Sequence, residues 1–243
     1  MSNFLMAALH TEPRPLEHQS AAWAWAWAQL STAQQEEFLR RFRADPATDH
    51  AVAAKPGTAG PLAVPYFSQR DSGTDQAARM CFSSSCAMLL EFLRPGTLKG
   101  PNGDDQYLRV VQRFGDTTDA GAQVQALQHF GVKARMVFNA DFELVCRQLE
   151  RGIPVPAGYI HRGPVDDPRG GGHYLIIIGI EANHVIVHDP WGEADLIIGS
   201  TVSSNGKNCR YSKKNFGRRW MVSEQGGRYR SAPGQGWAII AER

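Results

Sequence analysis

The sequence predicts an α+β fold in which helices come first along the chain and antiparallel strands follow. Apolar residues recur at helical spacing between residues 81 and 130, whereas short apolar runs of strand length dominate the second half of the chain. Two of these runs, at 174–180 and 184–188, are separated by only three residues, which favours a hairpin. Because helices precede paired strands instead of alternating with them, a doubly wound parallel sheet is not expected.

Three regions are distinguished along the 243 residues. Residues 1–46 are expected to form a small helical N-terminal region, because Trp23 and Trp27 fall on one helical face. Residues 47–61 are rich in Ala, Pro, Gly and Thr without a hydrophobic period, which is typical of a linker. The main domain is therefore expected to span residues 62–243 and to include a basic C-terminal segment.

The elements of the main domain follow from their periods and their flanking turn residues. Residues 62–68 are apolar and aromatic and form a short strand or an extended segment, and the polar residues 70–79 form a loop. Pro95-Gly96 ends the first helix and Gly131 ends the third. The predicted helices span 81–93, 104–114, 119–130 and 141–151. The predicted strands span 132–138, 153–160, 174–180, 184–188, 194–198 and 237–240.

Composition and charge exclude several classes of protein. Hydrophobic residues make up 42% and charged residues 21%, as in ordinary globular domains. No apolar run approaches the ~20 residues of a membrane helix, and no basic stretch followed by an apolar segment marks a secretory signal. The net charge of +2 is no nucleic-acid signature. We therefore expect a protein without a transmembrane segment that is cytoplasmic at synthesis and binds no nucleic acid.

The charge is unevenly distributed along the chain. Residues 201–243 carry nine Lys or Arg against two Glu, a local net charge of +7. Such a segment can hold an anionic polymer. No regular basic helix is evident there, so a solvated surface is the favoured interpretation.

The four cysteines form no metal or disulfide pattern. Cys81, Cys86, Cys146 and Cys209 contain no Cys-x-x-Cys pair, and the histidines show no His-Glu-x-x-His motif. We expect reduced thiols, no metal and no cofactor. Cys86 is expected to be a buried structural residue.

Three residues, together with a glutamine, supply the parts of a cysteine nucleophile site. Cys81 opens a predicted helix, where unpaired N–H groups and the helix dipole favour a thiolate. His173 begins a strand after three glycines and Asp189 ends the next strand, so a hairpin makes them neighbours. An imidazole so oriented stabilises the thiolate and protonates the leaving amine. Singly each of these residues has an ordinary structural explanation; in this order they favour catalysis.

A donor for the oxyanion is also needed, and two glutamines compete for that role. Gln69 ends the extended segment before the helix, whereas Gln76 lies in the polar loop. Gln69 is the preferred donor and Gln76 the alternative. The serines at 83–85 lack a Gly-x-Ser-x-Gly elbow and are expected to bond locally within the helix.

At these residues the chain resembles a papain-like cysteine peptidase of the C39-like group. That group typically shows Val-Pro-Tyr-x-Ser-Gln, then Cys-Gly-Pro-x-x-x-Ala-Met, then a Gly-His strand and an Asp-Pro segment. The matching segments here are Val64–Gln69, Cys81–Met88, Gly172-His173 and Asp189-Pro190. The resemblance implies a papain-like fold, with N-terminal helices packed on an antiparallel sheet.

The resemblance also implies roles for four residues. Cys81 is the nucleophile, His173 the general base and acid, Asp189 its orienting partner and Gln69 the oxyanion donor. Phe82 departs from the pattern, because it stands where the group has Gly. This substitution is expected either to narrow the cleft or to direct the ring elsewhere.

The expected function is that of a cysteine peptidase, acting through a thioester, with a peptide or peptidoglycan substrate. Because the sequence lacks a transporter's membrane segment and nucleotide-binding motif, a free-standing phage-type lysin is favoured, released by lysis or associated with a virion. Its basic end would then assist adsorption to the wall. The alternatives are a protein-directed peptidase or effector, and a non-enzymatic adaptor that docks through its N-terminal tryptophans.

Overall fold

The computed structural model describes residues 59–222 and 235–242. The predicted helical region at 1–46 lies outside the described residues, as does most of the predicted linker. Residues at the end of that linker already contact the sheet, because the Ala59 N–H donates to the Ile180 carbonyl at 2.9 Å. Within the described residues no helix is both long and apolar enough to cross a membrane.

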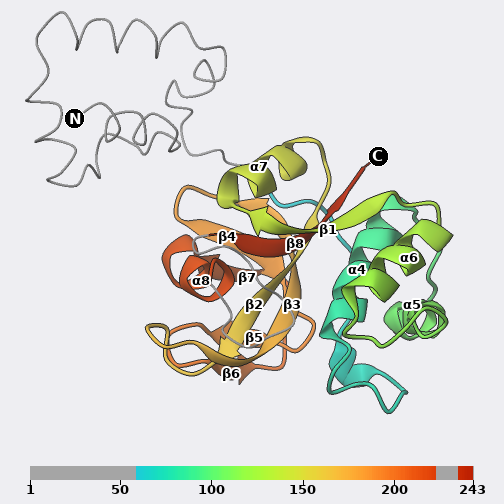
Figure 1. Cartoon of the computed structure of the whole chain (residues 1–243), viewed down its shortest axis with the longest axis horizontal. Helices are drawn as coiled ribbons and strands as arrows, with labels where there is room; N and C mark the ends of the chain where they lie inside the picture. The colour runs from blue at the N-terminus through green and yellow to red at the C-terminus, as the bar shows by residue number, and fades with distance from the viewer. Residues whose placement is uncertain (1–58, 223–234, 243) are drawn as a thin grey trace, which may run out of the picture. The chain divides into compact units, whose positions relative to one another are not determined.

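Six of the described strands form one antiparallel sheet in the order β1-β8-β2-β3-β4-β7 (Figure 1). These strands are β1 (Ala134–Ala140), β8 (Gly236–Ala241), β2 (Val155–Arg162), β3 (Arg169–Ile180), β4 (His184–His188) and β7 (Cys209–Ser212). A separate small hairpin consists of β5 (Glu193–Asp195) and β6 (Ser200–Ser203). The long central strands carry unbroken apolar runs because both of their faces are covered.

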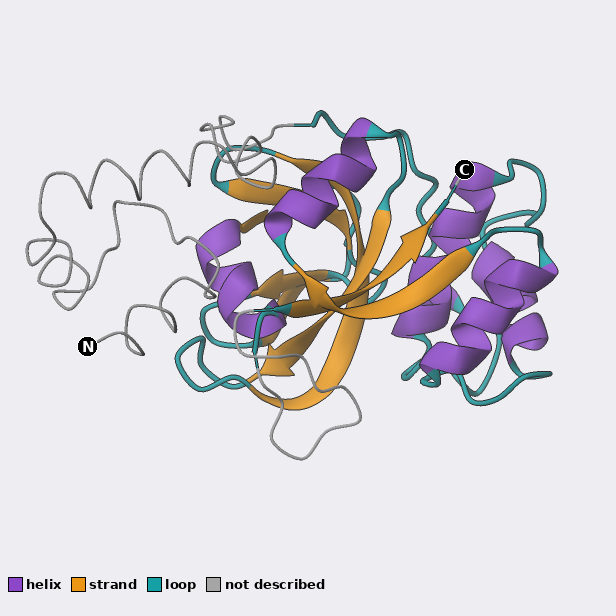
Figure 2. Cartoon of the chain, turned by 45° about the horizontal axis from the view of Figure 1, so that its top comes forward, coloured by secondary structure: helices purple, strands orange, loops and turns teal. Residues whose placement is uncertain are grey.

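The described helices lie in two groups around this sheet. In Figures 1 and 2, α4, α5 and α6 stand together on one side, whereas α7 and α8 lie with the strands. Helix α4 packs against β2 and β3, and a 3-10 turn, η2, precedes it. The helical elements are η2 (Gln69–Asp71), α4 (Cys81–Leu93), α5 (Gly103–Val111), α6 (Ala120–His129), α7 (Phe142–Glu150) and α8 (Lys213–Trp220).

The core lies between α4 and the centre of the sheet. Met88 and Leu89 of α4 are fully buried, as are Ile176 and Ile177 of β3. Burying each such side chain contributes about 1.5–3 kcal/mol, so this contact fixes α4 firmly on the strands. The first residue of α4 and the first half of β3 are thereby held in one place.

Most predicted elements occur within two or three residues of their expected bounds. The helix at 81–93 agrees end to end, and Asp119 and Asp141 cap α6 and α7 with their carboxylates. Residues 62–68 are an extended segment outside the named strands. Strands β6 and β7 were not predicted, because each is only four residues long and largely polar.

The expectation that the C-terminal segment holds no regular basic helix is wrong. Helix α8 contains Lys213, Lys214, Arg218 and Arg219. Only two large residues, Phe216 and Trp220, form its apolar side, so the helical period of apolar residues is too short to detect. Several basic residues of the segment are engaged. Arg210 pairs with Glu181 at 2.5 Å, Arg218 pairs with Asp166 at 2.6 Å, and Arg219 is buried.

Candidate active site

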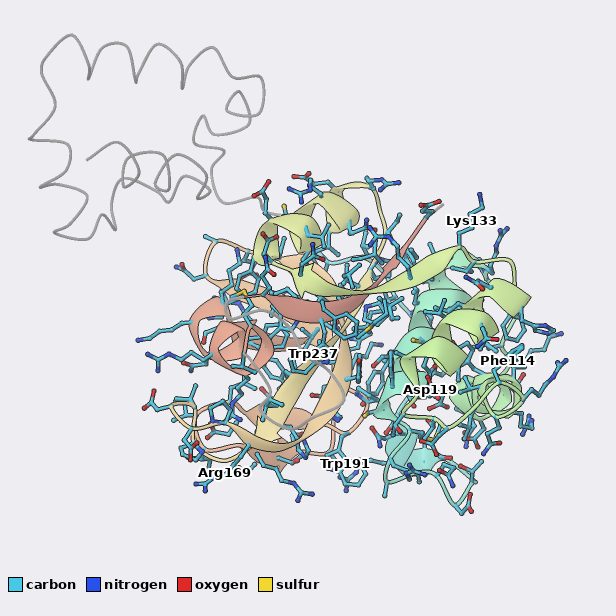
Figure 3. The ribbon with its side chains drawn as sticks, in the orientation of Figure 1. Phe114, Asp119, Lys133, Arg169, Trp191 and Trp237 are labelled. Atoms are coloured by element: carbon cyan, nitrogen blue, oxygen red, sulfur yellow. The ribbon has the colours of Figure 1, made fainter. Side chains whose placement is uncertain are left out.

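A cavity of about 420 Å³ lies between the start of α4 and the β2–β3–β4 part of the sheet. The four site residues expected from the sequence, Gln69, Cys81, His173 and Asp189, all line it. Trp191 also lines it and is labelled in Figure 3, at the lower edge between the sheet and the α4–α6 helices. The structure thus brings together residues that are more than a hundred positions apart in the chain.

Cys81 is the first residue of α4 and is partly exposed to the cavity. The residue before it, Met80, makes no side-chain capping bond. The N–H groups of a helix's first turn have no partner within the helix, and they carry the positive end of its dipole. An anion on the Cys81 sulfur or beside it is therefore stabilised here.

His173 and Asp189 meet because β3 and β4 pair in antiparallel register. The register aligns Ile176 of β3 with His188 of β4. Asp189, the next residue after β4, is therefore close to His173, which lies three residues before Ile176 on β3. The His173 Nε2 atom lies 2.7 Å from Asp189 Oδ1. The other ring nitrogen, Nδ1, is then the one left for the cysteine thiol.

The Asp189 carboxylate is buried and held by several donors. Its Oδ1 atom also accepts the Trp191 N–H at 3.1 Å. Its Oδ2 atom accepts the hydroxyls of Tyr159 at 3.1 Å and Tyr211 at 3.3 Å. The backbone is fixed as well, because the Asp189 N–H donates to the Gly206 carbonyl at 2.8 Å. A Cβ on residue 206 would lie 1.8 Å from the backbone carbonyl oxygen of Asp189, so the close approach of these two segments requires glycine at this position.

The electrostatics of this pair favour a charged imidazole. Burial by itself lowers the pKa of His173, but the charges of Asp189 and then Cys81, with hydrogen bonds to both, raise it to about 10. The His173 imidazolium therefore persists at neutral pH beside the Cys81 sulfur. This is the charge state that a cysteine nucleophile needs.

His188 is also buried, one strand away, but its surroundings are different. Its Nε2–H donates to the Val64 carbonyl and its Nδ1 accepts the Asn208 N–H, both at 3.0 Å. Burial lowers the pKa of His188, and the described residues supply no carboxylate to oppose it. This histidine is neutral and structural.

The two candidate oxyanion donors are placed differently. Gln69 is buried, lines the cavity, and donates its Nε2–H to the Ala77 carbonyl at 2.7 Å. Its Oε1 has no hydrogen-bond partner among the described residues. Gln76 is not among the cavity-lining residues, and its amide bonds Asp75 and Arg79 near the surface. One Nε2–H of Gln69 remains for a ligand, because the amide carries two.

The expectation that the serines at 83–85 bond locally is wrong for two of them. The Ser84 hydroxyl donates to buried Asp104 at 2.5 Å, and the Ser83 hydroxyl lies 2.8 Å from both Thr117 and Gln123. These bonds tie α4 to α5 and α6. The helix that carries Cys81 is thereby fixed on its polar side as well as its apolar side.

The other three cysteines are unsuited to nucleophilic chemistry. Cys86, Cys146 and Cys209 are buried, and burial raises the pKa of each thiol, to about 12 for Cys209. The described residues contain no cluster of three or more His, Cys, Asp or Glu arranged to hold a metal ion. Cys81 is thus the cysteine of the described chain that combines exposure with a histidine partner.

Comparisons with known proteins place these features in a family. The sequence profile of the Peptidase_C39 like family matches residues 61–225, more than half of the chain. The chain belongs to this family. No match was found among curated proteins.

Three solved structures are similar to this chain. A C39-like peptidase from Bacillus anthracis is 14% identical, with a TM-score of 0.50, and covers 76% of this chain and 98% of that one. The peptidase domain of Streptococcus ComA, a bifunctional ABC transporter of a quorum-sensing pathway, is 20% identical, with a TM-score of 0.44 and coverages of 74% and 96%. A Carica candamarcensis cysteine protease in complex with E-64 is 13% identical, with a TM-score of 0.35 and coverages of 73% and 92%. The predicted α+β, papain-like fold with an antiparallel sheet is confirmed.

In this C39-like chain, Phe82 departs from the glycine expected after the cysteine. Its ring is buried and stacks on Tyr174 with centroids 3.6 Å apart. Phe82 and Tyr174 both line the cavity, so the stacked pair forms part of its apolar wall. The substitution therefore joins α4 to β3 beside the site.

Sequence reasoning missed several residues that surround the site. Tyr159 and Tyr211 hold Asp189, and His161 lies with its ring centroid 5.8 Å from that of His173. Tyr159 could have been found, because it lies on a predicted strand of the site. Tyr211 belongs to a strand too short and polar to predict, so no sequence signal identified it.

Proposed function

We propose that the protein hydrolyses peptide bonds with Cys81 as nucleophile, His173 as base and acid, and Asp189 as the orienting carboxylate. The observation that carries the proposal is the 2.7 Å contact of His173 Nε2 with Asp189 Oδ1, in the cavity that Cys81 lines. The opposite ring nitrogen then serves the thiol. Three residues in these roles suffice for acyl transfer through a thioester.

The reaction proceeds in two balanced steps. The Cys81 thiolate attacks the carbonyl carbon, and the His173 imidazolium gives its proton to the departing amine as the C–N bond breaks. A water molecule then loses a proton to His173 and attacks the thioester, which releases the carboxylic acid and restores the thiolate. Asp189 orients the His173 ring and stabilises the imidazolium in both steps.

The tetrahedral intermediates need donors for their oxyanion. Gln69 is proposed to supply an Nε2–H, and the Cys81 N–H at the start of α4 a second one. Burial of Gln69 and its bond to Ala77 hold the amide in a fixed position. A preorganised donor costs little reorganisation when charge develops on the substrate oxygen.

The proposed substrate is the peptide part of bacterial peptidoglycan, cut by a phage-type lysin that reaches the wall after lysis or on a virion. Arg162 lines the cavity without an acidic partner among the described residues, whereas Arg79 is paired with Asp116, and the one acidic lining residue, Asp189, is engaged with His173. Such a cavity suits a substrate that carries carboxylates, as peptidoglycan peptides do. Trp191 adds a flat aromatic ring of the kind that sugars stack on.

The direct test is incubation with purified peptidoglycan and measurement of newly released amines. Wild-type protein and a Cys146→Ala control are expected to release them, and Cys81→Ala to release none. Hydrolysis of unrelated proteins without peptidoglycan would favour the protein-directed alternative.

A thiol-reactive probe separates enzyme from adaptor. Cys81 is expected to label much faster than the three buried cysteines, and His173→Ala is expected to remove that advantage. Equal labelling of Cys81 in wild type and His173→Ala, together with no hydrolysis, would support the non-enzymatic adaptor.

A further inference from the structure

One cation in the cavity wall has no acidic partner. The Arg162 side chain lies at the end of β2, is exposed, and lines the same cavity as Cys81 and His173. Within residues 59–222 and 235–242 no carboxylate forms an ion pair with it. Arg79, on the opposite wall, is instead paired with both oxygens of Asp116, at 2.9 and 3.0 Å.

The Arg162 guanidinium is oriented from one side only. Its Nε–H donates to His161 Nε2 at 3.2 Å, and the His161 Nδ1–H donates to the Gly171 carbonyl at 2.6 Å. Gly171 precedes the Gly172-His173 pair on β3. The two terminal nitrogens of Arg162 make no hydrogen bond to the described residues. They present a fork of N–H donors that matches a carboxylate.

The backbone under Arg162 is fixed by a second, buried arginine. Arg219 of α8 is fully buried and donates to three carbonyls at the end of β2: Ile160 at 3.0 Å, Arg162 at 3.2 Å and Gly163 at 2.6 Å. The Arg219 Nε–H donates to the carbonyl of Leu196 at 2.6 Å, at the start of the turn that joins β5 to β6. The Arg219 guanidinium therefore links the end of β2 to the turn between β5 and β6.

The turn between β5 and β6 completes this wall. Gly199, Ser200 and Thr201 line the cavity. Gly199 has φ +74°, and a Cβ there would lie 2.4 Å from the Gly163 carbonyl oxygen, so the two segments touch backbone to backbone. Because these contacts fix the backbone around Arg162, its guanidinium is a preorganised binding group.

We propose that Arg162, oriented by His161, forms a subsite that binds a carboxylate of the substrate close to the bond being cut. The inference rests on the proposed function and specifies which chemical group of the substrate is recognised at that site. The carboxylate belongs either to an acidic side chain or to a chain terminus. Both use the same bidentate, charge-assisted hydrogen bonds. Because Arg162 is exposed, the preference weakens as salt increases.

The test uses small alkylating probes that react at Cys81, so no natural substrate is needed. Iodoacetyl-glutamic acid α-amide carries a side-chain carboxylate and is matched by iodoacetyl-glutamine amide. Iodoacetyl-glycine carries a terminal carboxylate and is matched by iodoacetyl-glycine amide. The rate of Cys81 alkylation is measured by mass spectrometry for each acid and its amide. The pair with the larger acid-to-amide ratio identifies the source of the carboxylate.

In wild type, one acid is expected to react about tenfold faster than its amide, the effect of one charge-assisted contact. Arg162→Gln should lower the acid-to-amide ratio close to that set by the His173 imidazolium alone. Arg162→Lys should give an intermediate ratio, because lysine keeps the positive charge but lacks the planar fork of donors. Arg169→Gln is the matched control, since Arg169 (Figure 3) is exposed but does not line the cavity. Its ratio should equal that of wild type.

The subsite is disproved if Arg162→Gln leaves both acid-to-amide ratios at their wild-type values. That result, with peptidoglycan hydrolysis intact, would overturn the subsite and leave the peptidase proposal standing. Slow labelling of Cys81 that does not depend on His173 would overturn the peptidase proposal instead. Thermal unfolding of Arg162→Gln is expected to match wild type, because only backbone atoms of this residue bond Arg219.

Discussion

The two walls of the cavity position their reactive groups by different means. On the helical wall, Cys81 is placed by the first turn of one helix, and its anion-stabilising N–H groups come from that same turn. On the sheet wall, His173 and Asp189 meet only because β3 and β4 pair in one register. The position of Cys81 thus depends on local structure, and that of His173 depends on contacts between distant parts of the chain.

The two buried histidines differ in pKa, again because of contacts between distant parts of the chain. His173 and His188 lie on neighbouring strands, yet the pKa of His173 is raised to about 10 whereas that of His188 is lowered. Burial lowers both. What separates them is the Asp189 carboxylate, which contacts one ring, while backbone groups contact the other.

The largest effect is expected from the helical wall. Cys81→Ser should lower peptidoglycan hydrolysis by at least about 10⁴-fold, because a helix terminus and an imidazole do not ionise a serine hydroxyl. The thermal unfolding midpoint should stay near that of wild type. Retained turnover would place the nucleophile elsewhere and would make Cys86 the first residue to test.

Two substitutions compare residues within the sheet wall. His173→Ala should slow kcat more than Asp189→Ala, by about tenfold to a hundredfold, because His173 carries the proton and Asp189 only orients and stabilises the ring. Steady-state kinetics of both variants measure the difference. A silent Asp189→Ala variant would mean that the strand register does not set the base.

The charge of the same pair predicts a pH dependence. The pKa of His173 is raised, so its imidazolium persists from neutral pH and is lost as pH rises through about 10. Asp189→Asn removes the main raising charge, so the alkaline loss of kcat/KM should move to lower pH in that variant. An unchanged alkaline limit would show that a group other than His173 sets it.

A smaller loss is expected from the oxyanion donor beside the helical wall. Gln69→Ala should lower kcat by about 10²–10³-fold with little change in KM, because the amide meets charge present mainly in the intermediate. Gln76→Ala is the control and should have little effect. A large loss at Gln76 with none at Gln69 would reverse the assignment.

The smallest effect is expected one contact away from the base. Tyr159→Phe removes one hydroxyl donor from Asp189, while the bonds from Trp191, Tyr211 and His173 remain. A loss of a few-fold in kcat is expected, in line with a single hydrogen bond. A loss as large as that of Asp189→Ala would mean that the tyrosine positions the whole carboxylate.

What the sequence predicted follows the same division between local and distant structure. The helix at 81–93 has a clear period and a Pro-Gly stop, so both of its ends were predicted. The β3–β4 hairpin was predictable because its two apolar runs are close in the chain. Because this hairpin was expected, His173 and Asp189 were predicted to be neighbours.

The parts that escaped prediction depend on distant contacts. Tyr211 reaches Asp189 from β7, and Arg219 crosses from α8 to the end of β2. No sequence pattern identifies the partner of either residue, and β7 and α8 are short elements of four and eight residues. The bonds of Ser83 and Ser84 to other helices were likewise invisible, because a serine near a helix start usually bonds its own backbone.

The position of β8 has a consequence for how the protein is made. This strand is the last of the described strands to be synthesised, yet it lies between β1 and β2, pairing Ala238 with both Val137 and Ala157. In a growing chain Cys81 and His173 are therefore made before the sheet beneath them can close. Because this pairing joins residues far apart in the chain, forming it costs loop-closure entropy and is expected to slow folding. The cavity that Cys81 and His173 line is therefore expected to form only after residues 236–241 have been made.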